Sequence, residues 1–164
     1  MIHQTSYHIR PYQPHDLAAC LQIFQSNCPA FFDVSEKELF IHWLQHQGQG
    51  QPVYPNTIQD YYFVIESDVH GLTGCGGYYV LDKNQEARLA WGMIHAACHK
   101  QGYGTALYAH RRAHIHTYWP GHTITLGTSQ HTFPFYEKMG MQVMAHQPQG
   151  YGKDLDRYDM QIKA

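Results

Sequence analysis

The chain has 164 residues, of which 43% are hydrophobic and 15% charged, and its formal net charge at neutral pH is −2. This length suits one domain with a continuous core, and the small charge gives no electrostatic reason to expect nucleic acid or a membrane as the main partner. No apolar run is long enough to cross a bilayer, and the first residues lack the apolar centre of a signal peptide. The four cysteines form no C-x-x-C pair, so we expect a cytoplasmic protein with free thiols.

The first third of the chain predicts one strand followed by two helices. Alternating side chains over residues 7–12 indicate a short strand. Apolar residues at helical spacing predict a helix over residues 14–27. A second helix is expected after Ser35, because Ser35-x-x-Glu38 has the form of a capping box.

The middle of the chain predicts three consecutive antiparallel strands. Two strand-like runs cover residues 60–66 and 72–81, and a third begins at Leu89, with a short turn before each of the last two. The second run contains Gly74, Gly76 and Gly77. Glycines weaken a strand, so these three predict a bulge or a close approach by another part of the molecule.

A glycine loop follows the third of these strands. The chain turns polar, passes through Gly102-Tyr103-Gly104 and is expected to open a helix at about Thr105. The first amides of a helix lack an intrahelical partner, and glycine lets an anion approach the backbone closely. The loop therefore predicts a site for a phosphorylated ligand. It is neither a P-loop nor a dinucleotide fingerprint, because G-x-x-x-x-G-K-[ST] is absent and Leu107 occupies the position of the third small residue.

The last third of the chain alternates helices and strands. We expect a helix over residues 105–118, a strand over 123–127, a short helix over 131–139, a strand over 141–144, a polar loop over 147–156 and a final strand over 158–162. The complete order is β-α-α-β-β-β-α-β-α-β-β. This is an α+β fold in one domain spanning residues 1–164, in which a meander leads into a β-α-β crossover.

Two motifs on these elements resemble the signatures of the GNAT acetyltransferases. Residues 99–104, His-Lys-Gln-Gly-Tyr-Gly, are similar to the family's R/Q-x-x-G-x-G/A loop, with His99 in the place of the usual Arg or Gln. Residues 136–141, Tyr-Glu-Lys-Met-Gly-Met, are similar to the signature that follows the fifth strand. Upstream of that signature, Ser129 and Thr132 stand where the family commonly has Asn and Ala. The order of elements agrees with the family along nearly the whole chain.

Further stretches resemble a subgroup of the same family. They are W-G-M at residues 91–93, T-S-Q-H at 128–131 and L-D-R at 155–157. The resemblance implies the GNAT fold, with a mixed, mostly antiparallel central sheet of six or seven strands flanked by about four helices. It also implies transfer of an acetyl group from acetyl-CoA to a primary amine of a small molecule, peptide or protein. A homodimer is compatible with this function.

The resemblance assigns roles to individual residues. It places the pyrophosphate of acetyl-CoA on the amides of residues 101–106, and its pantetheine arm along the fourth strand, which splays from the fifth. The expected cofactor-binding residues are Met93, Ile94, His95, His99, Gln101, Gly102, Tyr103, Gly104, Thr105, Ala106 and Ser129. Tyr136 corresponds to the tyrosine that protonates the leaving thiolate.

The group that deprotonates the amine stays open. Some family members carry a Glu on the fourth strand, where an ungapped count places Arg88, while Glu86 lies two residues earlier on the same face. Ordered water, Glu86 and His95 are the candidates, with water ranked first. For the acceptor, the loop between the first two helices offers Phe31, Phe32 and Asp33 as candidate contacts.

Two other functions compete with the enzyme. One is a CoA-binding regulatory module without turnover, which the unusual His99 leaves open. The other is metal binding by a group of histidines in residues 110–122, which are His110, His114, His116 and His122. No acid or cysteine nearby completes a ligand set, so we interpret these histidines as a solvated helix face and expect no metal site.

Overall fold

A computed structural model describes residues 6–163 of the chain. In chain order its elements are β1 (Tyr7–Pro11), α1 (Leu17–Ser26), α2 (Lys37–Gln45), β2 (Thr57–Ser67), β3 (Gly71–Leu81), β4 (Glu86–Ile94), α3 (Tyr103–Tyr118), β5 (Thr123–Thr128), α4 (Phe133–Lys138), β6 (Gln142–Gly152) and β7 (Leu155–Lys163), with short 3-10 turns η1 (Pro14–Asp16), η2 (Val34–Glu36) and η3 (Ala96–Cys98). The seven strands form one sheet in the order β1-β2-β3-β4-β5-β7-β6. The predicted order of elements and the mixed, mostly antiparallel sheet are confirmed.

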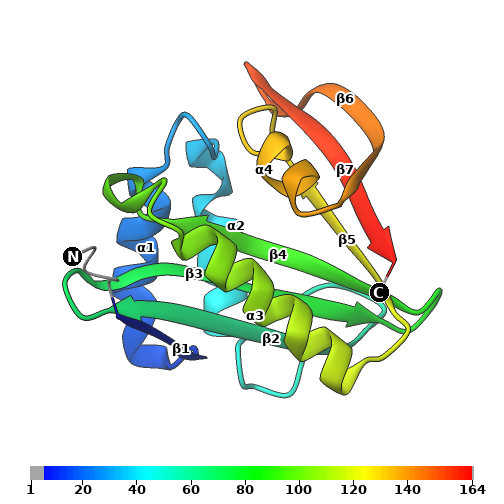
Figure 1. Cartoon of the computed structure of the whole chain (residues 1–164), viewed down its shortest axis with the longest axis horizontal. Helices are drawn as coiled ribbons and strands as arrows, with labels where there is room; N and C mark the ends of the chain where they lie inside the picture. Colours follow the sequence, from blue (N-terminus) through cyan, green and yellow to red (C-terminus); the bar gives the residue numbers. More distant parts are fainter. Residues whose placement is uncertain (1–5, 164) are drawn as a thin grey trace.

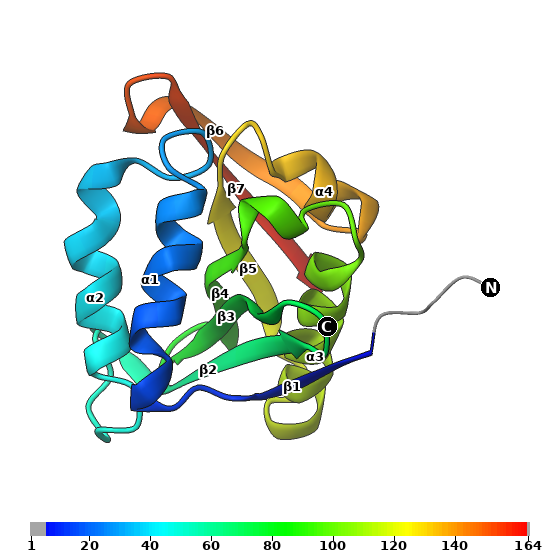
Figure 2. The ribbon, with the colours of Figure 1, turned by 90° about the vertical axis from the view of Figure 1, so that its left-hand side faces the viewer.

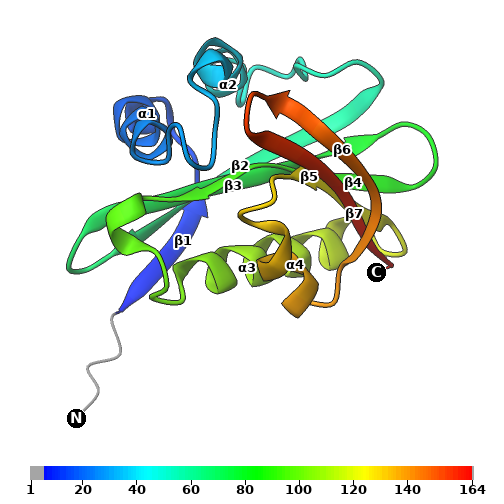
Figure 3. The ribbon, with the colours of Figure 1, turned by 90° about the horizontal axis from the view of Figure 1, so that it is seen from above.

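Helices cover both faces of this sheet (Figures 1 and 3). The first two, α1 and α2, lie on one face, and α3 and α4 lie on the other. On the first face, Phe24, Phe40 and Trp43 pack with buried residues of β2. On the second face, Leu107 and Ile115 of α3 pack with buried residues of β3 to β5. Strand β3, which lies between β2 and β4, is consequently buried along most of its length.

The start of α2 differs from the prediction. Its capping box is formed by Asp33 and Glu36 rather than by Ser35 and Glu38. Asp33 Oδ1 accepts a hydrogen bond from the Ser35 amide at 2.8 Å, and Glu36 Oε2 accepts one from the Asp33 amide at 3.0 Å. The chain passes through the turn η2 before α2, and this turn moves the box two residues earlier.

The prediction of a polar loop over residues 147–156 is wrong. This stretch belongs to a β-hairpin in which β6 pairs with β7 as far as Gly152 opposite Leu155. Strand β6 lies at the edge of the sheet and is exposed along nearly its whole length. A strand with no buried face needs no apolar alternation, so its composition is that of a loop. The hairpin stands beside the α1–α2 loop (Figure 2), with Gly152 against the Asp33 carboxylate.

The pairing of β4 with β5 is short, and it positions the cleft described below. The two strands run parallel and pair only over residues 86–88 of β4 and 123–125 of β5. Beyond that point they diverge (Figure 1), while β4 remains paired with β3 as far as Ile94. One edge of residues 89–94 therefore has no neighbouring strand.

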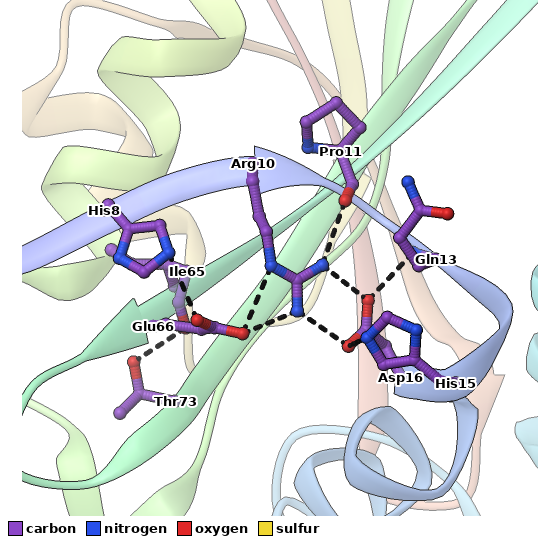
Figure 4. A network of polar contacts seen from close by, with 9 residues as sticks. All are labelled: His8, Arg10, Pro11, Gln13, His15, Asp16, Ile65, Glu66 and Thr73. Carbon is purple, nitrogen blue, oxygen red and sulfur yellow. Dashed lines mark hydrogen bonds and ion pairs between the residues drawn. The ribbon is translucent and has the colours of Figure 1, made fainter.

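A charge cluster joins β1 to η1 and β2 (Figure 4). The Arg10 guanidinium donates to both carboxylate oxygens of Asp16, each at 2.8 Å, and to Glu66 Oε1 through Nε at 3.2 Å. His8 Nε2 lies 3.1 Å from the other Glu66 oxygen. The Asp16 side chain is only 4% exposed, and its Oδ2 also accepts the Gln13 amide. This bidentate geometry ties the first strand to the start of the first helix.

This cluster predicts a pH-dependent contribution to stability. Burial raises the pKa of Asp16, but hydrogen bonds from Arg10 and the Gln13 amide outweigh it and hold the pKa below its ordinary value. A lowered pKa in the folded state stabilises the protein above pH 4, and this stabilisation is lost as the pH falls through the lowered pKa. We expect Asp16→Asn to reduce the free energy of unfolding by about 2 kcal/mol at pH 7, with the difference from the parent shrinking below pH 4.

Urea denaturation at pH 7, 5 and 3 measures this effect. The control is Asp68→Asn in the exposed β2–β3 turn, which should change little at any pH. A deficit of Asp16→Asn that stays the same at all three pH values would contradict the role of the ionised carboxylate.

Gly77 predicts a second effect on stability. A Cβ at this position would overlap the Tyr61 carbonyl oxygen on the neighbouring strand and would lie 2.7 Å from the Tyr62 ring. Because the obstacle is backbone, it cannot turn aside. We expect Gly77→Ala to cost about 3 kcal/mol in urea denaturation. Gly76→Ala, whose Cβ would approach no atom closer than 3.1 Å, should cost clearly less, and equal losses would show that general loss of glycine flexibility is the cause.

Candidate active site

A cleft of about 950 Å³ opens where β4 and β5 diverge. One end lies at the start of α3, and the other lies between the α1–α2 loop and the β6–β7 hairpin. The first helical layer contributes Asn27, Phe31, Phe32 and Glu36, and β4 contributes residues 88–94. The region of α3 contributes His99, Lys100, Gly102, Gly104, Thr105 and Arg111. Further lining residues come from the end of β5 and the segment after it (residues 127–129), from Phe135 and Tyr136 of α4, and from Tyr151 and Arg157 of the β6–β7 hairpin.

The α3 end of the cleft presents free backbone amides. Helix α3 starts at Tyr103, two residues earlier than predicted, because Gly102 adopts a left-handed φ of +90° and serves as its N-cap. The first bond of the helix runs from the Ala106 amide to the Gly102 carbonyl at 3.1 Å. Among the described residues, the amides of positions 101–105 have no hydrogen-bond acceptor. Together with the helix dipole, they form a donor set suited to a pyrophosphate.

Two side chains support this anionic site. Lys100 and Lys138 both line the cleft, and Lys100 adopts a left-handed φ of +61° directly before the loop. Tyr103 is 2% exposed and packs edge-on against Tyr7 of β1, with ring centroids 6.3 Å apart. The buried ring anchors the first turn of α3, so the loop amides are held in place. The chain thus fits a phosphorylated cofactor at the loop that the sequence indicated.

His99 connects the loop to the end of β4. Its Nε2 lies 2.8 Å from the Ile94 carbonyl oxygen, which also accepts a hydrogen bond from Asn27 Nδ2 at 2.9 Å. A carbonyl cannot donate, so Nε2 carries the proton in this contact. His95 has a different position. Its amide donates to the Thr73 carbonyl, and its Nδ1 accepts a hydrogen bond from the Ala97 amide, so the side chain caps the turn η3. His95 is not among the residues that line the cleft.

The free edge of β4 is held in a bulge. Trp91 has a positive φ of 51°, and its carbonyl accepts a hydrogen bond from the buried Tyr62 hydroxyl at 2.8 Å. The register between β3 and β4 shifts at this point, opposite Gly76. A Cβ on Gly92 would lie 2.9 Å from a guanidinium nitrogen of Arg111. A larger residue at position 92 would therefore require the buried Arg111 guanidinium to shift.

Arg111 is a site residue that the sequence reasoning missed. It is 2% exposed and lines the cleft from α3. Its Nη1 makes one long contact of 3.4 Å with the Gly77 carbonyl, and its Nε has no partner among the described residues. No described carboxylate lies within ion-pair distance of the Arg111 guanidinium. A signal was available, because the buried face of α3 repeats through Tyr103, Leu107, Arg111 and Ile115, and an arginine in that row is unexpected.

Tyr136 brings a hydroxyl to the opposite wall. The side chain is 8% exposed and packs edge-on against Phe135 and Tyr108, with centroids 5.0 and 5.9 Å away. Its hydroxyl makes no hydrogen bond with another described residue, and the residue lines the cleft. Ser129 starts the segment before α4: its carbonyl accepts the amides of positions 132 and 133, and its Oγ accepts the His131 amide. Ser129 thereby orients the helix that carries Tyr136.

The far end of the cleft lies on the α1/α2 face and is aromatic. Phe32 stacks on Trp91 at 6.2 Å, and the Trp91 indole donates to the Tyr54 hydroxyl at 3.1 Å. Phe31 lies between His99 and His131, with centroids 5.1 and 5.9 Å away. Phe31 and Phe32 both line the cleft, and their contact with an acceptor stays a prediction. Asp33 does not line it, because its carboxylate caps η2 and contacts Gly152.

The two glutamates near the cleft have different positions. Glu86 lies at the paired end of β4, outside the cleft lining, where its Oε1 accepts the Thr125 hydroxyl at 2.6 Å and lies 4.0 Å from an Arg88 nitrogen. Glu36 lines the cleft, and burial raises its pKa above the ordinary value although the hydrogen bond from the Asp33 amide opposes this. Glu36 is therefore the carboxylate that the cleft offers, and the sequence reasoning missed it.

Two of the α3 histidines, His110 and His114, pack against the sheet, so the predicted solvated face is wrong for them, whereas His116 is exposed as predicted. His114 Nδ1 lies 2.5 Å from the Tyr78 hydroxyl, and its ring packs against Phe63. His110 packs edge-on against Phe63 at 4.7 Å. Burial lowers the pKa of both histidines. Within residues 6–163, no group of three or more metal-ligating side chains comes together.

Two further properties concern the whole described chain. No helix within it is long and apolar enough to span a membrane. The four cysteines are free thiols, as expected, and Cys20 and Cys75 are fully buried.

The chain is similar to known acetyltransferases. A family model described as an acetyltransferase (GNAT) domain matches residues 59–143, just over half of the chain. A comparison with curated protein sequences found no match. Among solved structures, a protein from Desulfovibrio desulfuricans described as a GNAT-family acetyltransferase superposes with a TM-score of 0.77 at 17% identity, over 96% of this chain and 99% of that one.

Two other solved structures have similar scores. The ribosomal-protein-S18-alanine N-acetyltransferase of Escherichia coli gives a TM-score of 0.71 at 16% identity, over 96% of this chain and 94% of that one. The protein yncA of Salmonella typhimurium, described as an acetyltransferase and solved with its cofactor acetyl-CoA, gives 0.72 at 16% identity, over 97% and 94% of the two chains. At these identities the likeness concerns the fold.

Proposed function

Because the chain belongs to the GNAT acetyltransferase family, we propose that it transfers an acetyl group from acetyl-CoA to a primary amine, as one domain. The observation that carries this proposal is the cleft between the free edge of β4 and the Tyr136 hydroxyl, which ends at the unpaired amides of α3. Acetyl-CoA supplies an activated thioester, whose acetyl group an amine can take while the CoA thiol leaves.

The cofactor would be held at two places. The amides of residues 101–105, with Lys100 and Lys138 beside them, would bind its pyrophosphate. The free edge of β4, residues 89–94 with Met93 and Ile94, would bind the pantetheine arm through backbone hydrogen bonds. His99 would keep the two places in register, because it joins the loop to the Ile94 carbonyl. In this role a histidine can replace the usual Arg or Gln.

Tyr136 is the proposed acid. Its hydroxyl has no partner among the described residues and faces the cleft, so its proton is available for a sulfur atom that develops negative charge. A positioned general acid contributes on the order of 10²- to 10⁴-fold in rate. Ser129 and the packing of Phe135 and Tyr108 fix the direction of this hydroxyl.

The attacking amine must lose a proton, because an alkylammonium has a pKa of about 10.4. We keep ordered water as the first acceptor of that proton, and place Glu36 behind it, because Glu36 lines the cleft and its pKa is raised toward neutrality. Glu86 and His95 lie outside the cleft lining. Either could act only through water that reaches the cleft.

The first test is cofactor binding. We expect the protein to bind acetyl-CoA in calorimetry, and Gly104→Glu to weaken binding by at least about tenfold, because it places a carboxylate among the loop amides. A Cβ at Gly104 meets only ordinary contacts of 3.6 Å or more with Phe135, so the fold should tolerate the change. Gly104→Gln, of equal size without the charge, should lose less. No binding by the parent protein would contradict the proposal.

The second test concerns the acid. Tyr136→Phe is expected to lower kcat by about 100-fold or more, with the acetyl-CoA dissociation constant unchanged. The matched control is Tyr108→Phe, which removes the hydroxyl of a buried neighbour that does not line the cleft, and which should keep most of the activity. Equal rates in Tyr136→Phe and the parent would assign Tyr136 to packing. Cofactor binding without acetylation of any amine would favour a regulatory CoA-binding module.

A further inference from the structure

Three hydrogen-bond donors converge at the end of the cleft that lies between the α1–α2 loop and the β6–β7 hairpin. They are the Arg88 and Arg157 guanidinium groups and the Tyr151 hydroxyl, and all three residues line the cleft. Their closeness is measured at Gly127 of β5: a Cβ there would lie 2.5 Å from the Tyr151 oxygen, 3.2 Å from Arg88 Nη2 and 3.5 Å from Arg157 Nε. The Arg157 guanidinium carbon also lies 5.8 Å from the centre of the Tyr151 ring. Strands β4 and β7 and the β6–β7 hairpin therefore deliver their donors to one place.

The carboxylates near these arginines do not use all of their donors. Asp159 Oδ1 accepts both Nε and Nη2 of Arg157 at 3.0 Å, and the same oxygen is 3.5 Å from Arg88 Nη2. A single carboxylate oxygen thus serves two guanidinium groups, each of which has five N–H donors. Among the described residues, Arg157 Nη1 has no acceptor. The side chains of Arg88 and Arg157 remain 22% and 36% exposed.

The balance of charge on the cleft wall is positive. Of the described side chains that line the cleft, five are cationic and one is a carboxylate. The cations are Arg88, Lys100, Arg111, Lys138 and Arg157, and the carboxylate is Glu36. Neither Asp159 nor Glu86 lines the cleft. Asp159 accepts from Arg157 Nε and lies near Arg88 Nη2, the two guanidinium nitrogens closest to Gly127, so the donors left without an acceptor among the described residues are Arg157 Nη1 and the Tyr151 hydroxyl. A cationic surface around a place with three donors favours an oxyanion.

We infer that the acceptor is an amine that also carries an oxyanionic group, a carboxylate or a phosphate, and that Arg88, Arg157 and Tyr151 bind this group. The inference rests on the proposed acetyl transfer and names the substrate class for it. A planar guanidinium pairs with carboxylate or phosphate oxygens through two parallel hydrogen bonds, which also fixes the orientation of the substrate. A polyamine lacks an oxyanion and brings further positive charge toward these arginines.

The surroundings fit a small amino acid or phosphoamine. Tyr54, Tyr79 and Trp91 form the aromatic part of this end, with the Tyr54 and Tyr79 rings 4.6 Å apart. Glu36 is the single described carboxylate on the wall. Burial raises the pKa of Tyr151 to about 12, and the nearby charges of Arg157 and Arg88 lower it while that of Glu36 raises it. Opposite charges thus face the same space, as the separate amine and oxyanion of one small substrate require.

Matched pairs of acceptors test this inference. Each pair has one member with the oxyanion and one without: L-α-amino acids against their α-carboxamides, and phosphoethanolamine against ethanolamine, with spermidine as a polycationic comparison. We expect the oxyanionic member of at least one pair to be acetylated with a kcat/KM about 10- to 100-fold higher than its partner, as a charged hydrogen-bonded contact implies. The two kinds of pair separate a carboxylate substrate from a phosphate substrate.

Variants connect the preference to the site. Arg157→Gln and Arg88→Gln should each reduce the preference for the oxyanionic member at least about tenfold. Gly127→Ala keeps both arginines but places a methyl group among the three donors, and it should reduce the preference as well. Lys153→Gln removes one positive charge from the exposed turn of the same hairpin, and it should keep the preference of the parent. Circular dichroism checks that each variant is folded.

Acetyl-CoA binding, measured first by calorimetry, separates the two levels of failure. A protein that does not bind acetyl-CoA overturns the proposed function. A protein that binds acetyl-CoA and acetylates neutral amines or spermidine as well as oxyanionic ones overturns only the substrate class. The same holds if no oxyanionic amine is acetylated, or if Lys153→Gln loses the preference as much as Arg157→Gln does.

Discussion

The short pairing of β4 with β5 is the constraint on which the rest of the molecule depends. After three paired residues on each strand the two diverge, although both remain in one sheet through β3 and β7. The unpaired segment of β4 contains the bulge at Trp91, and the Tyr62 hydroxyl fixes this bulge by donating a hydrogen bond to the Trp91 carbonyl. The Arg111 guanidinium lies against Gly92, beside the bulge. A sheet that paired fully at this place would have neither a free strand edge nor a cleft.

The cleft joins two ends with different chemistry, and each end is built on a different layer. The α3 end offers backbone amides with two lysines, which suits a phosphorylated cofactor, and its geometry depends on Gly102 and on the buried Tyr103. The other end offers Arg88 and Arg157 over an aromatic wall on the α1/α2 face. Tyr136 lies between them. In the proposed function, acetyl-CoA would bind at the α3 end and the amine at the other end, with the free edge of β4 between them.

Much of the fold could be predicted from the sequence, because it depends on local patterns. The order of elements followed from periodicity and turn residues, and the GNAT resemblance carried by residues 99–104 and 136–141 is confirmed by a family model that covers both. Errors arose where the pattern was weak. Strand β6 is exposed on both faces, so its sequence resembles that of a loop. The capping box before α2 lies two residues earlier than predicted, because the turn η2 precedes the helix.

The site was predicted less completely than the fold, because only part of it is built from local sequence patterns. The glycine loop and Tyr136 belong to local motifs, and Phe31 and Phe32 stood out as adjacent aromatics. Arg157 and Glu36 line the cleft because the β6–β7 hairpin and the α1–α2 loop lie at one end of it, and no spacing in the sequence encodes that approach. The environment of His110 and His114 also required the structure, because their packing against β2 and β3, and not their helical spacing, decides it.

Hydrogen–deuterium exchange with and without saturating acetyl-CoA tests the central claim most directly, because it reports the free edge and the free amides together. The amides of residues 101–105 have no acceptor among the described residues, and residues 89–94 have one unpaired edge. We predict that acetyl-CoA slows exchange in both segments and leaves the exposed strand β6 unchanged. Binding that slows exchange in neither segment, or only in β6, would contradict the account.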